Sequence, residues 1–253
     1  METCCNYFPV TLSKEVDLDP NGKYLFAYHP HGIISNGVSG ALMTNALGFS
    51  NMFPGVHLHP LTLSINFCWP LYRELAYALG FCTVSKKSID YLFGIGHSCL
   101  IVVGGAEESL MARPNTADLF LTNRKGFVAV AIKNGASLVP VYGFGENEGF
   151  DLVIPEPDSL VIKAQKFLKS LVGFTLPLYH GRTVFTYNYG FLPKRSPINV
   201  VVGPPIHTKY DPNPSKELVE LVHKEYMDAL HDLYERNKEK YTPGDVIPEL
   251  KFV

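Results

Sequence analysis

His29 and His31 stand on either side of a proline in the segment YHPHG. An imidazole has a pKa near neutrality, so it can take a proton from an alcohol at neutral pH. A carboxylate beside the ring can fix its tautomer and stabilise its charged form, and Glu107 and Glu108 follow a second apolar run. These residue types predict catalysis by proton transfer, a chemistry that needs no nucleophilic serine. A lone histidine is more often structural and most carboxylates are solvated, but a pair on one constrained turn favours catalysis.

Two strand ends must bring these groups together. Residues 23–29, KYLFAYH, are an apolar and aromatic run that stops at the proline, which predicts a buried strand. Residues 99–109, CLIVVGGAEES, predict a second strand that ends in a glycine pair. Ligand sites of open α/β sheets gather at the carboxyl ends of the strands. We therefore expect His29, His31 and Glu108 to converge at one edge of the sheet.

Gly and Pro punctuation predicts alternating helices and strands in the rest of the chain. Helical spacing marks residues 70–80, and residues 124–150 predict a helix, an Asn-Gly stop, a strand and a glycine-rich loop. Further strands are expected at 183–190 and 198–205. Ser215 is expected to cap a long final helix. One face of that helix carries Leu218, Val222, Tyr226, Leu230 and Leu233.

The elements predict one α/β domain over residues 1–253, with a mostly parallel mixed sheet flanked by helices. Residues 1–20 are expected to precede the first core strand. The chain is 46% apolar and 18% charged, which excludes a disordered protein, and its net charge of −2 excludes a protein that coats nucleic acid.

The cysteines and the apolar runs restrict the environment of the chain. Five cysteines without a C-x-x-C pair argue against a disulfide framework, and Cys68, Cys82 and Cys99 are expected to be packing residues. No apolar stretch reaches the length of about 18 residues that a transmembrane helix needs. The first residues also lack the pattern of a signal peptide.

A metal site is the main alternative from spacing alone. His57 and His59 form a second pair two residues apart, and four imidazoles could meet around zinc. Pro30 and Pro60 disturb regular strand geometry, however, and no ligand motif such as H-E-x-x-H accompanies the pairs. We therefore expect no metal, and expect His57 and His59 to be packing or surface residues.

Six blocks resemble, in order, those of the diacylglycerol acyltransferase type 2 family, which includes monoacylglycerol and wax-alcohol acyltransferases. They are NYFPVTL (6–12), YHPHG (28–32), VVGGAEES (102–109), RKGF (124–127), LVPVYGFGENEGF (138–150) and VVGPPI (201–206). The resemblance covers nearly the whole chain and implies a glycerolipid acyltransferase-like fold. It implies transfer of a fatty acyl group from acyl-CoA to diacylglycerol, which gives triacylglycerol. Monoacylglycerol and a long-chain alcohol are the alternative acceptors.

The resemblance also implies residue roles. His31 or His29 would be the general base, and the acidic residue of the G-G-x-x-E block falls on Glu108 rather than Glu107. Main-chain N–H groups near glycines would stabilise the oxyanion. The two basic residues of RKGF suit the phosphates of CoA, with solvated charges as the alternative. The expected substrate-binding residues are Pro30, Gly32, Gly104, Gly105, Arg124 and Lys125. No cofactor is implied, because acyl-CoA is a co-substrate.

Two features depart from related acyltransferases. The wider glycerolipid acyltransferases have an aspartate five positions after their histidine, whereas Asn36 and Ile34 follow His31 and His29 at that distance. Relatives also carry a hydrophobic hairpin before the Tyr-Phe-Pro block, and no such hairpin is expected in residues 1–253. A non-catalytic lipid-binding module that has lost turnover is therefore the alternative function.

Membrane contact is expected from residues 158–179. Lys163, Lys166 and Lys169 fall on one side of a helix there and apolar residues fill the other, although a surface helix packed on the core shows the same pattern. The expected partners are acyl-CoA, a neutral lipid and a membrane surface, and homo-oligomerisation is left open. The expected location is the cytosolic face of the endoplasmic reticulum membrane, with the lipid droplet as a second location.

Overall fold

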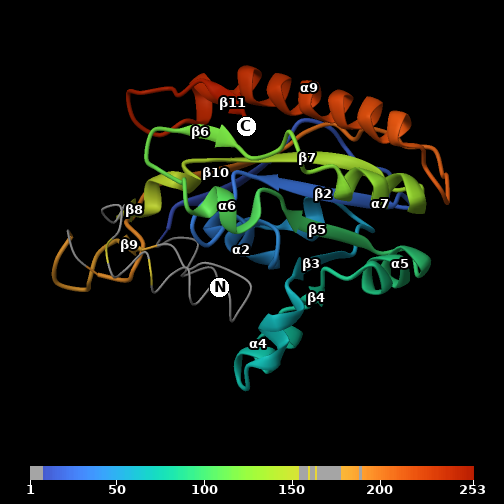
Figure 1. Ribbon diagram of the computed structural model, residues 1–253. Helices are drawn as coiled ribbons and strands as arrows, with labels where there is room; N and C mark the ends of the chain where they lie inside the picture. Colours follow the sequence, from blue (N-terminus) through green and yellow to red (C-terminus); the bar gives the residue numbers. More distant parts are fainter. Residues whose placement is uncertain (1–7, 154–158, 160–162, 164–177, 188–189) are drawn as a thin grey trace.

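The computed structural model describes residues 8–153, 159, 163, 178–187 and 190–253. A seven-stranded sheet lies at its centre, in the order β1-β10-β7-β2-β5-β3-β4 (Figure 1). Its strands are β1 (Val10–Lys14), β2 (Tyr24–His29), β3 (Leu58–Thr62), β4 (Cys82–Thr83), β5 (Ser98–Val102), β7 (Ser137–Phe144) and β10 (Ile198–Val202). Neighbouring strands are parallel except β10 and β7. The prediction of a mostly parallel mixed sheet is confirmed.

Helices cover both faces of the sheet. They are α2 (Asn36–Ala41), α3 (Phe49–Met52), α4 (Tyr72–Ala78), α5 (Lys86–Gly94), α6 (Gly105–Ser109), α7 (Gly126–Asn134) and α9 (Lys216–Tyr241), with the 3-10 helices η1 (Asn45–Leu47), η2 (Ser64–Cys68) and η3 (Glu146–Gly149). Helices α5, α7 and α9 pack on one face, and α2 and α3 pack on the other. Two small sheets pair β6 (Ala117–Leu119) with β11 (Leu250–Phe252) and β8 (Asp151–Leu152) with β9 (Tyr179–His180).

Strand β2 is buried along its whole length, as is typical of a central strand in a parallel sheet. Leu25 and Ala27 belong to the core under α5, α7 and α9. Tyr24, Phe26 and Tyr28 belong to the core under α2 and α3. Successive side chains of a strand point to opposite faces, so β2 supplies both cores. Because β5 and β7 pair with its two sides, the residues after β2 start from a fixed strand end.

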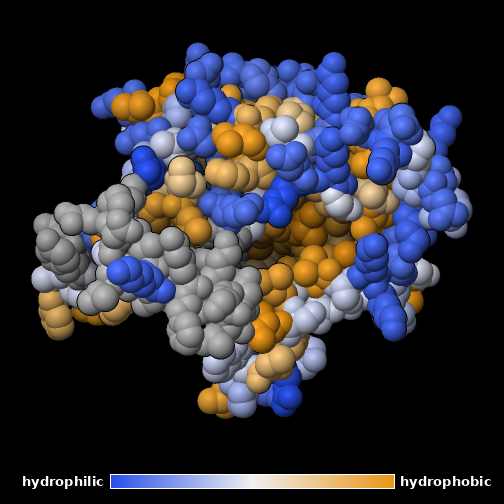
Figure 2. All heavy atoms as spheres, in the orientation of Figure 1, coloured by the Kyte–Doolittle hydropathy of each residue, from blue (hydrophilic) through white to orange (hydrophobic). Residues whose placement is uncertain are grey.

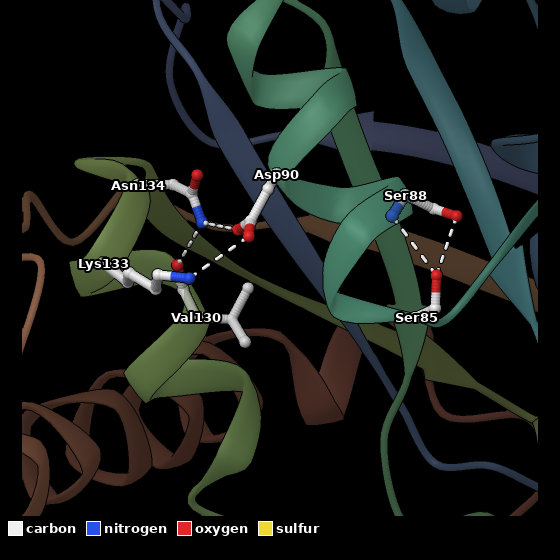
Figure 3. A network of polar contacts seen from close by, with 6 residues as sticks. All are labelled: Ser85, Ser88, Asp90, Val130, Lys133 and Asn134. Atoms are coloured by element: carbon white, nitrogen blue, oxygen red, sulfur yellow. Dashed lines mark hydrogen bonds and ion pairs between the residues drawn. The ribbon is translucent and has the colours of Figure 1, made fainter.

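Polar contacts join α5 to α7 (Figure 3). Asp90 accepts a hydrogen bond from Asn134 at 3.0 Å and forms an ion pair with Lys133 at 3.1 Å. Ser85 caps α5, because its Oγ accepts the N–H of Ser88 at 3.2 Å. Since α5 contacts β5 and α7 contacts β7, these bonds hold the helical layer over the centre of the sheet.

The predicted elements are largely confirmed. Ser215 caps α9 by accepting the N–H of Leu218 at 3.2 Å. The predicted apolar face of α9 is buried at Val222, Tyr226, Leu230 and Leu233. The helix expected at 70–80 is α4, the helix and strand expected in 124–150 are α7 and β7, and the strand expected at 198–205 is β10.

Three expectations are wrong. The sequence predicts that residues 1–20 precede the first core strand, but β1 lies among them, because it pairs with β10 from the far end of the chain. Residues 183–187 form a turn instead of a strand, in which Thr183 Oγ1 accepts the N–H of Thr186 at 2.9 Å. Cys68, expected to be a packing residue, is exposed.

The predicted amphipathic helix at 158–179 falls almost entirely outside the described residues. The structure therefore leaves that prediction as it stands. Within the ranges given above, no helix has both the length and the apolar character needed to cross a bilayer.

Candidate active site

The turn after β2 has a shape that its sequence dictates. It runs through Pro30, His31 and Gly32, and the His29–Pro30 peptide bond is cis. Gly32 has a φ of +57°, and a Cβ there would lie 2.8 Å from Cγ of Glu146. Only glycine adopts such a φ readily, and only glycine fits this space.

The second strand end reaches the turn through Glu108. After β5 the chain passes Gly104 and Gly105, at φ of +101° and +68°, and then enters α6. Glu108 Oε1 accepts the main-chain N–H of His31, and Oε2 accepts the N–H of Phe120 at 2.9 Å. The expected convergence of His31 and Glu108 at one edge of the sheet is confirmed.

The Glu108 carboxyl group is held in an environment that favours its neutral form. Its residue is only 3% exposed. Burial raises the pKa of Glu108 from 4.5 to about 7, and the two N–H donors and the charge of Arg124 oppose that shift. The group therefore titrates near neutral pH. Carboxyl groups perturbed in this way cluster at functional sites.

The sequence predicts that Glu108 orients an imidazole ring. In the structure its carboxyl group accepts main-chain N–H groups instead. Both of its oxygens already accept main-chain N–H groups, and no hydrogen bond joins it to either ring within the described part of the chain. His31 Nδ1 instead lies 3.1 Å from the carbonyl oxygen of Gly32. A carbonyl only accepts, so Nδ1 carries the hydrogen and Nε2 keeps its lone pair. Glu108 thus fixes the main chain of His31, and Gly32 fixes its ring.

The state of the His31 ring suits a base. Burial lowers the pKa of His31 below its ordinary value of 6.5. The imidazole is therefore neutral at pH 7, which is the form that accepts a proton. The residue is also partly exposed, so a substrate can approach it.

His29 lies in a different environment. It is fully buried, and its Nε2 lies 2.9 Å from the hydroxyl of Tyr226 on α9. That hydroxyl donates to the carbonyl of Ala27 at 3.2 Å, so Nε2 of His29 donates to the tyrosine oxygen. Burial lowers the pKa of His29 to about 3. His29 is therefore a neutral ring that ties the end of β2 to α9, out of reach of a substrate.

A second buried carboxyl group, Glu146, supports the turn from the other side. It accepts the Tyr28 hydroxyl at 2.6 Å and the main-chain N–H groups of Asn36 and Gly37 at 2.6 and 2.8 Å. Burial raises the pKa of Glu146. The sequence signal that marks Glu146, which was not among the predicted site residues, is its place in a glycine-rich segment directly after the apolar strand β7.

The glycines predicted to leave room for an oxyanion differ in their surroundings. A Cβ at Gly104 would overlap the Glu108 carboxyl group, and the space beside Gly32 is filled by Glu146. No atom of the described residues lies within 4 Å of a Cβ built at Gly105. Of these three positions, Gly105 is the one that the described part of the chain leaves open for a substrate oxygen. Pro30 lines a small cavity of about 30 Å³ beside Glu146.

Arg124 and Lys125 lie at the surface near the start of α7. Arg124 forms an ion pair with Glu107 at 2.5 Å, and Lys125 forms one with Glu220 at 3.0 Å. Arg124 also lines a cavity of about 420 Å³ together with Glu107 and Phe120. Since Phe120 binds Glu108, this cavity adjoins the site. The charges are thus exposed and paired, and one of them borders a space large enough for part of a ligand.

The histidines weighed as zinc ligands do not meet those of the turn. His59 Nε2 lies 2.9 Å from His97 Nδ1 and the two rings stack, while His57 is exposed with its ring 5.1 Å from that of His97. Among the described residues, no group of three or more His, Cys, Asp or Glu side chains is arranged to hold a metal ion.

Comparison with known proteins identifies the family. A family model described as diacylglycerol acyltransferase matches residues 1–251. The chain belongs to this family. It is 47% identical over 253 residues to diacylglycerol O-acyltransferase 2A of Umbelopsis ramanniana, covering 98% of this chain and 71% of the relative. Family membership confirms the resemblance and makes the chain an O-acyltransferase.

Relatives that act on other acceptors are nearly as similar. The human 2-acylglycerol O-acyltransferase 1 is 43% identical over 239 residues, or 93% of this chain and 71% of that protein. The human acyl-CoA wax alcohol acyltransferase 1 is 42% identical over 238 residues, or 93% of this chain and 73% of that protein.

A solved structure shares the fold. The crystal structure of the 1-acyl-sn-glycerophosphate acyltransferase from Thermotoga maritima superimposes with a TM-score of 0.50 at 10% identity, over 94% of this chain and 76% of that one. The predicted glycerolipid acyltransferase-like α/β fold is therefore confirmed.

Proposed function

We propose that this acyltransferase moves a fatty acyl group from acyl-CoA to the free hydroxyl of diacylglycerol, with His31 as the general base. The observation that carries the proposal is the state of His31. Its Nδ1 hydrogen points to the Gly32 carbonyl, its Nε2 has no hydrogen-bond partner among the described residues, and its pKa is lowered by burial. A neutral ring held in this way can remove the hydroxyl proton as the oxygen attacks the thioester carbonyl.

The reaction balances in one displacement. The acceptor oxygen forms a bond to the thioester carbon while His31 Nε2 takes its proton. The carbon–sulfur bond then breaks, and the CoA thiolate leaves and recovers a proton from the imidazolium. A main-chain N–H beside the open space at Gly105 would stabilise the oxyanion between the two steps. Arg124, on the wall of the neighbouring cavity, would bind a phosphate of CoA.

Diacylglycerol is the acceptor named for the two Umbelopsis ramanniana relatives at 47% identity, which are diacylglycerol O-acyltransferases. The relatives named for 2-acylglycerol and wax alcohol make those acceptors the alternatives. We also propose that the enzyme works on the cytosolic face of the endoplasmic reticulum membrane, and on lipid droplets. Cell fractionation against marker proteins tests that location.

A competition assay tests the acceptor. Purified protein receives labelled acyl-CoA and equal amounts of diacylglycerol, monoacylglycerol and a long-chain alcohol in detergent. We expect triacylglycerol to be the main labelled product. A main product of diacylglycerol or wax ester would reassign the acceptor, and no product from folded protein would favour the non-catalytic lipid-binding module.

A further inference from the structure

One part of the molecule exposes large apolar side chains instead of burying them. Helices η2 and α4 project from the body of the domain below the sheet (Figure 1). Leu71 is 85% exposed and Trp69 is 61% exposed, at the tip between the two helices. We name this the α4 surface and define it by the exposed residues Leu63, Ile65, Trp69, Leu71, Tyr72, Leu75 and Tyr77.

The backbone itself presents these side chains. Among the residues of α4, only Ala76 is buried. Leu71 has a φ of +68°, a conformation that residues other than glycine rarely adopt. The rings of Phe67 on η2 and Tyr77 on α4 lie 5.0 Å apart, so the two helices support each other while their outer faces stay open. Exposed apolar patches of this kind mark interaction sites.

The chemistry of the α4 surface matches a lipid bilayer. Tryptophan and tyrosine combine an apolar ring with one polar atom, and they concentrate at the boundary between acyl chains and headgroups. Exposed cations stand nearby. The N–H of Val84 donates to the carbonyl of Thr62 at 2.8 Å, which brings Lys86 and Lys87 at the start of α5 close to the start of η2. Ammonium groups in this position suit anionic headgroups.

The α4 surface also rises from the edge of the sheet that carries the catalytic turn. Strands β3, β5 and β2 are parallel, so their carboxyl ends lie at one edge. Helix η2 follows β3, Glu108 follows β5, and His31 follows β2. Adjacent strands are about 5 Å apart, which separates β3 from β2 by about 10 Å. Figure 2 shows hydrophobic side chains around α4 and a hollow with hydrophobic walls above it on the same face.

We propose that the α4 surface inserts into the lipid bilayer and holds the carboxyl edge of the sheet against the membrane. A neutral lipid acceptor then reaches His31 without crossing water. The identity of the acceptor rests on the proposed function, but insertion of the α4 surface does not.

Trp69 provides a direct probe, because it is the only tryptophan of the chain. The full chain is mixed with vesicles of phosphatidylcholine and anionic phospholipid, and tryptophan fluorescence is recorded. We expect a blue shift, and quenching by lipids brominated on their acyl chains. Unquenched fluorescence from protein that floats with the vesicles would overturn the proposal, because another surface would then be inserted. Failure to float would also overturn it.

Matched variants test the same surface by binding. The double variant Leu71→Asp, Leu75→Asp is expected to lower the vesicle-bound fraction by about tenfold or more, since both side chains lose their place in the apolar layer. Leu221→Asp is the control, because Leu221 is 66% exposed on α9, above the sheet in Figure 1. Equal loss of binding in both variants would overturn the proposal. All three substituted positions are exposed, so folding is expected to hold and is checked by circular dichroism.

Activity on two forms of substrate separates this proposal from the proposed function. The double variant is expected to lose about tenfold in activity on diacylglycerol in vesicles and to keep its activity on a short-chain diacylglycerol dispersed in detergent. Wild type that floats but turns over neither substrate would contradict the proposed function alone. A blue shift of Trp69 that follows protein concentration without vesicles, with dimers in sedimentation, would overturn insertion in favour of a second copy of the chain.

Discussion

Two histidines at the end of β2 lie in opposite environments. His29 is the last residue of the strand, and His31 lies in the turn that follows it. His29 is fully buried and bonded to Tyr226, and burial lowers its pKa to about 3. His31 is partly exposed, with its ring bonded to a carbonyl of its own turn and its main chain bonded to Glu108. One proline separates a ring that joins two elements from a ring that can meet a substrate. Residue type alone therefore does not assign a catalytic role.

The largest expected effect separates the two histidines by activity. His31→Ala removes the proposed base and is expected to lower kcat by about 100- to 10,000-fold, which is the usual contribution of general base catalysis. The measurement is product formation from labelled acyl-CoA and diacylglycerol. His57→Ala is the control, since His57 is exposed and outside the site. Full activity of His31→Ala would reverse the comparison.

The next effect concerns the carboxyl group that fixes the turn. Glu108→Ala leaves the N–H groups of His31 and Phe120 without acceptors. The expected loss is about 2–6 kcal/mol in the free energy of unfolding, because each of the two unsatisfied donors costs about 1–3 kcal/mol. Urea denaturation measures it. Glu107→Ala is the matched control and should change stability by less than about 0.5 kcal/mol, since its ion pair with Arg124 is exposed. Equal losses would show that Glu108 does not hold the turn.

A pH series sharpens the role of the same carboxyl group. The pKa of Glu108 is about 7 in the folded protein against an ordinary value of 4.5, so the folded state binds the proton more tightly. Its contribution to stability is therefore present below pH 4.5 and is lost as the pH rises to about 7. The stability of wild type relative to Glu108→Gln should fall by about 3 kcal/mol over this window.

The difference between the two proteins is the informative quantity in that series. The lowered pKa of His29 acts in the opposite direction. Between about pH 3 and 6.5 the unfolded state binds a proton on His29 that the folded state does not bind, so stability rises with pH over this range. Subtraction of the Glu108→Gln curve removes this contribution. A flat difference for Glu108→Gln would contradict the raised pKa.

The smallest expected effect tests the bond of the buried histidine. Tyr226→Phe leaves the Nε2 hydrogen of His29 without an acceptor. We expect a loss of about 1 kcal/mol in the free energy of unfolding and little change in kcat, because His29 acts only on the position of β2. Tyr210→Phe serves as the control, since Tyr210 is 69% exposed. A fall in kcat as large as that of His31→Ala, with stability unchanged, would make His29 the base.

The two strand ends of the site were predictable because their signals are local. The apolar run of β2 stops at His29, and the run of β5 stops just before Gly104 and Gly105, so periodicity and turn residues locate both ends. The failures came where a distant partner decides the outcome. Residues 10–14 form a strand because β10 pairs with them. Residues 183–187 belong to no strand of the described sheets.

By itself, the sequence determined most of the elements, the family and the meeting of His31 and Glu108 at the sheet edge, because each depends on side chains close together in the chain. Only the tertiary structure decided their contacts. Glu108 is hydrogen-bonded to the main chain of His31 and not to the His31 ring. His29 is hydrogen-bonded to Tyr226, 197 residues away. The tertiary structure also placed Glu146 against Tyr28, 118 residues earlier. Such pairings depend on which strands become neighbours, and that is settled by packing the whole sheet.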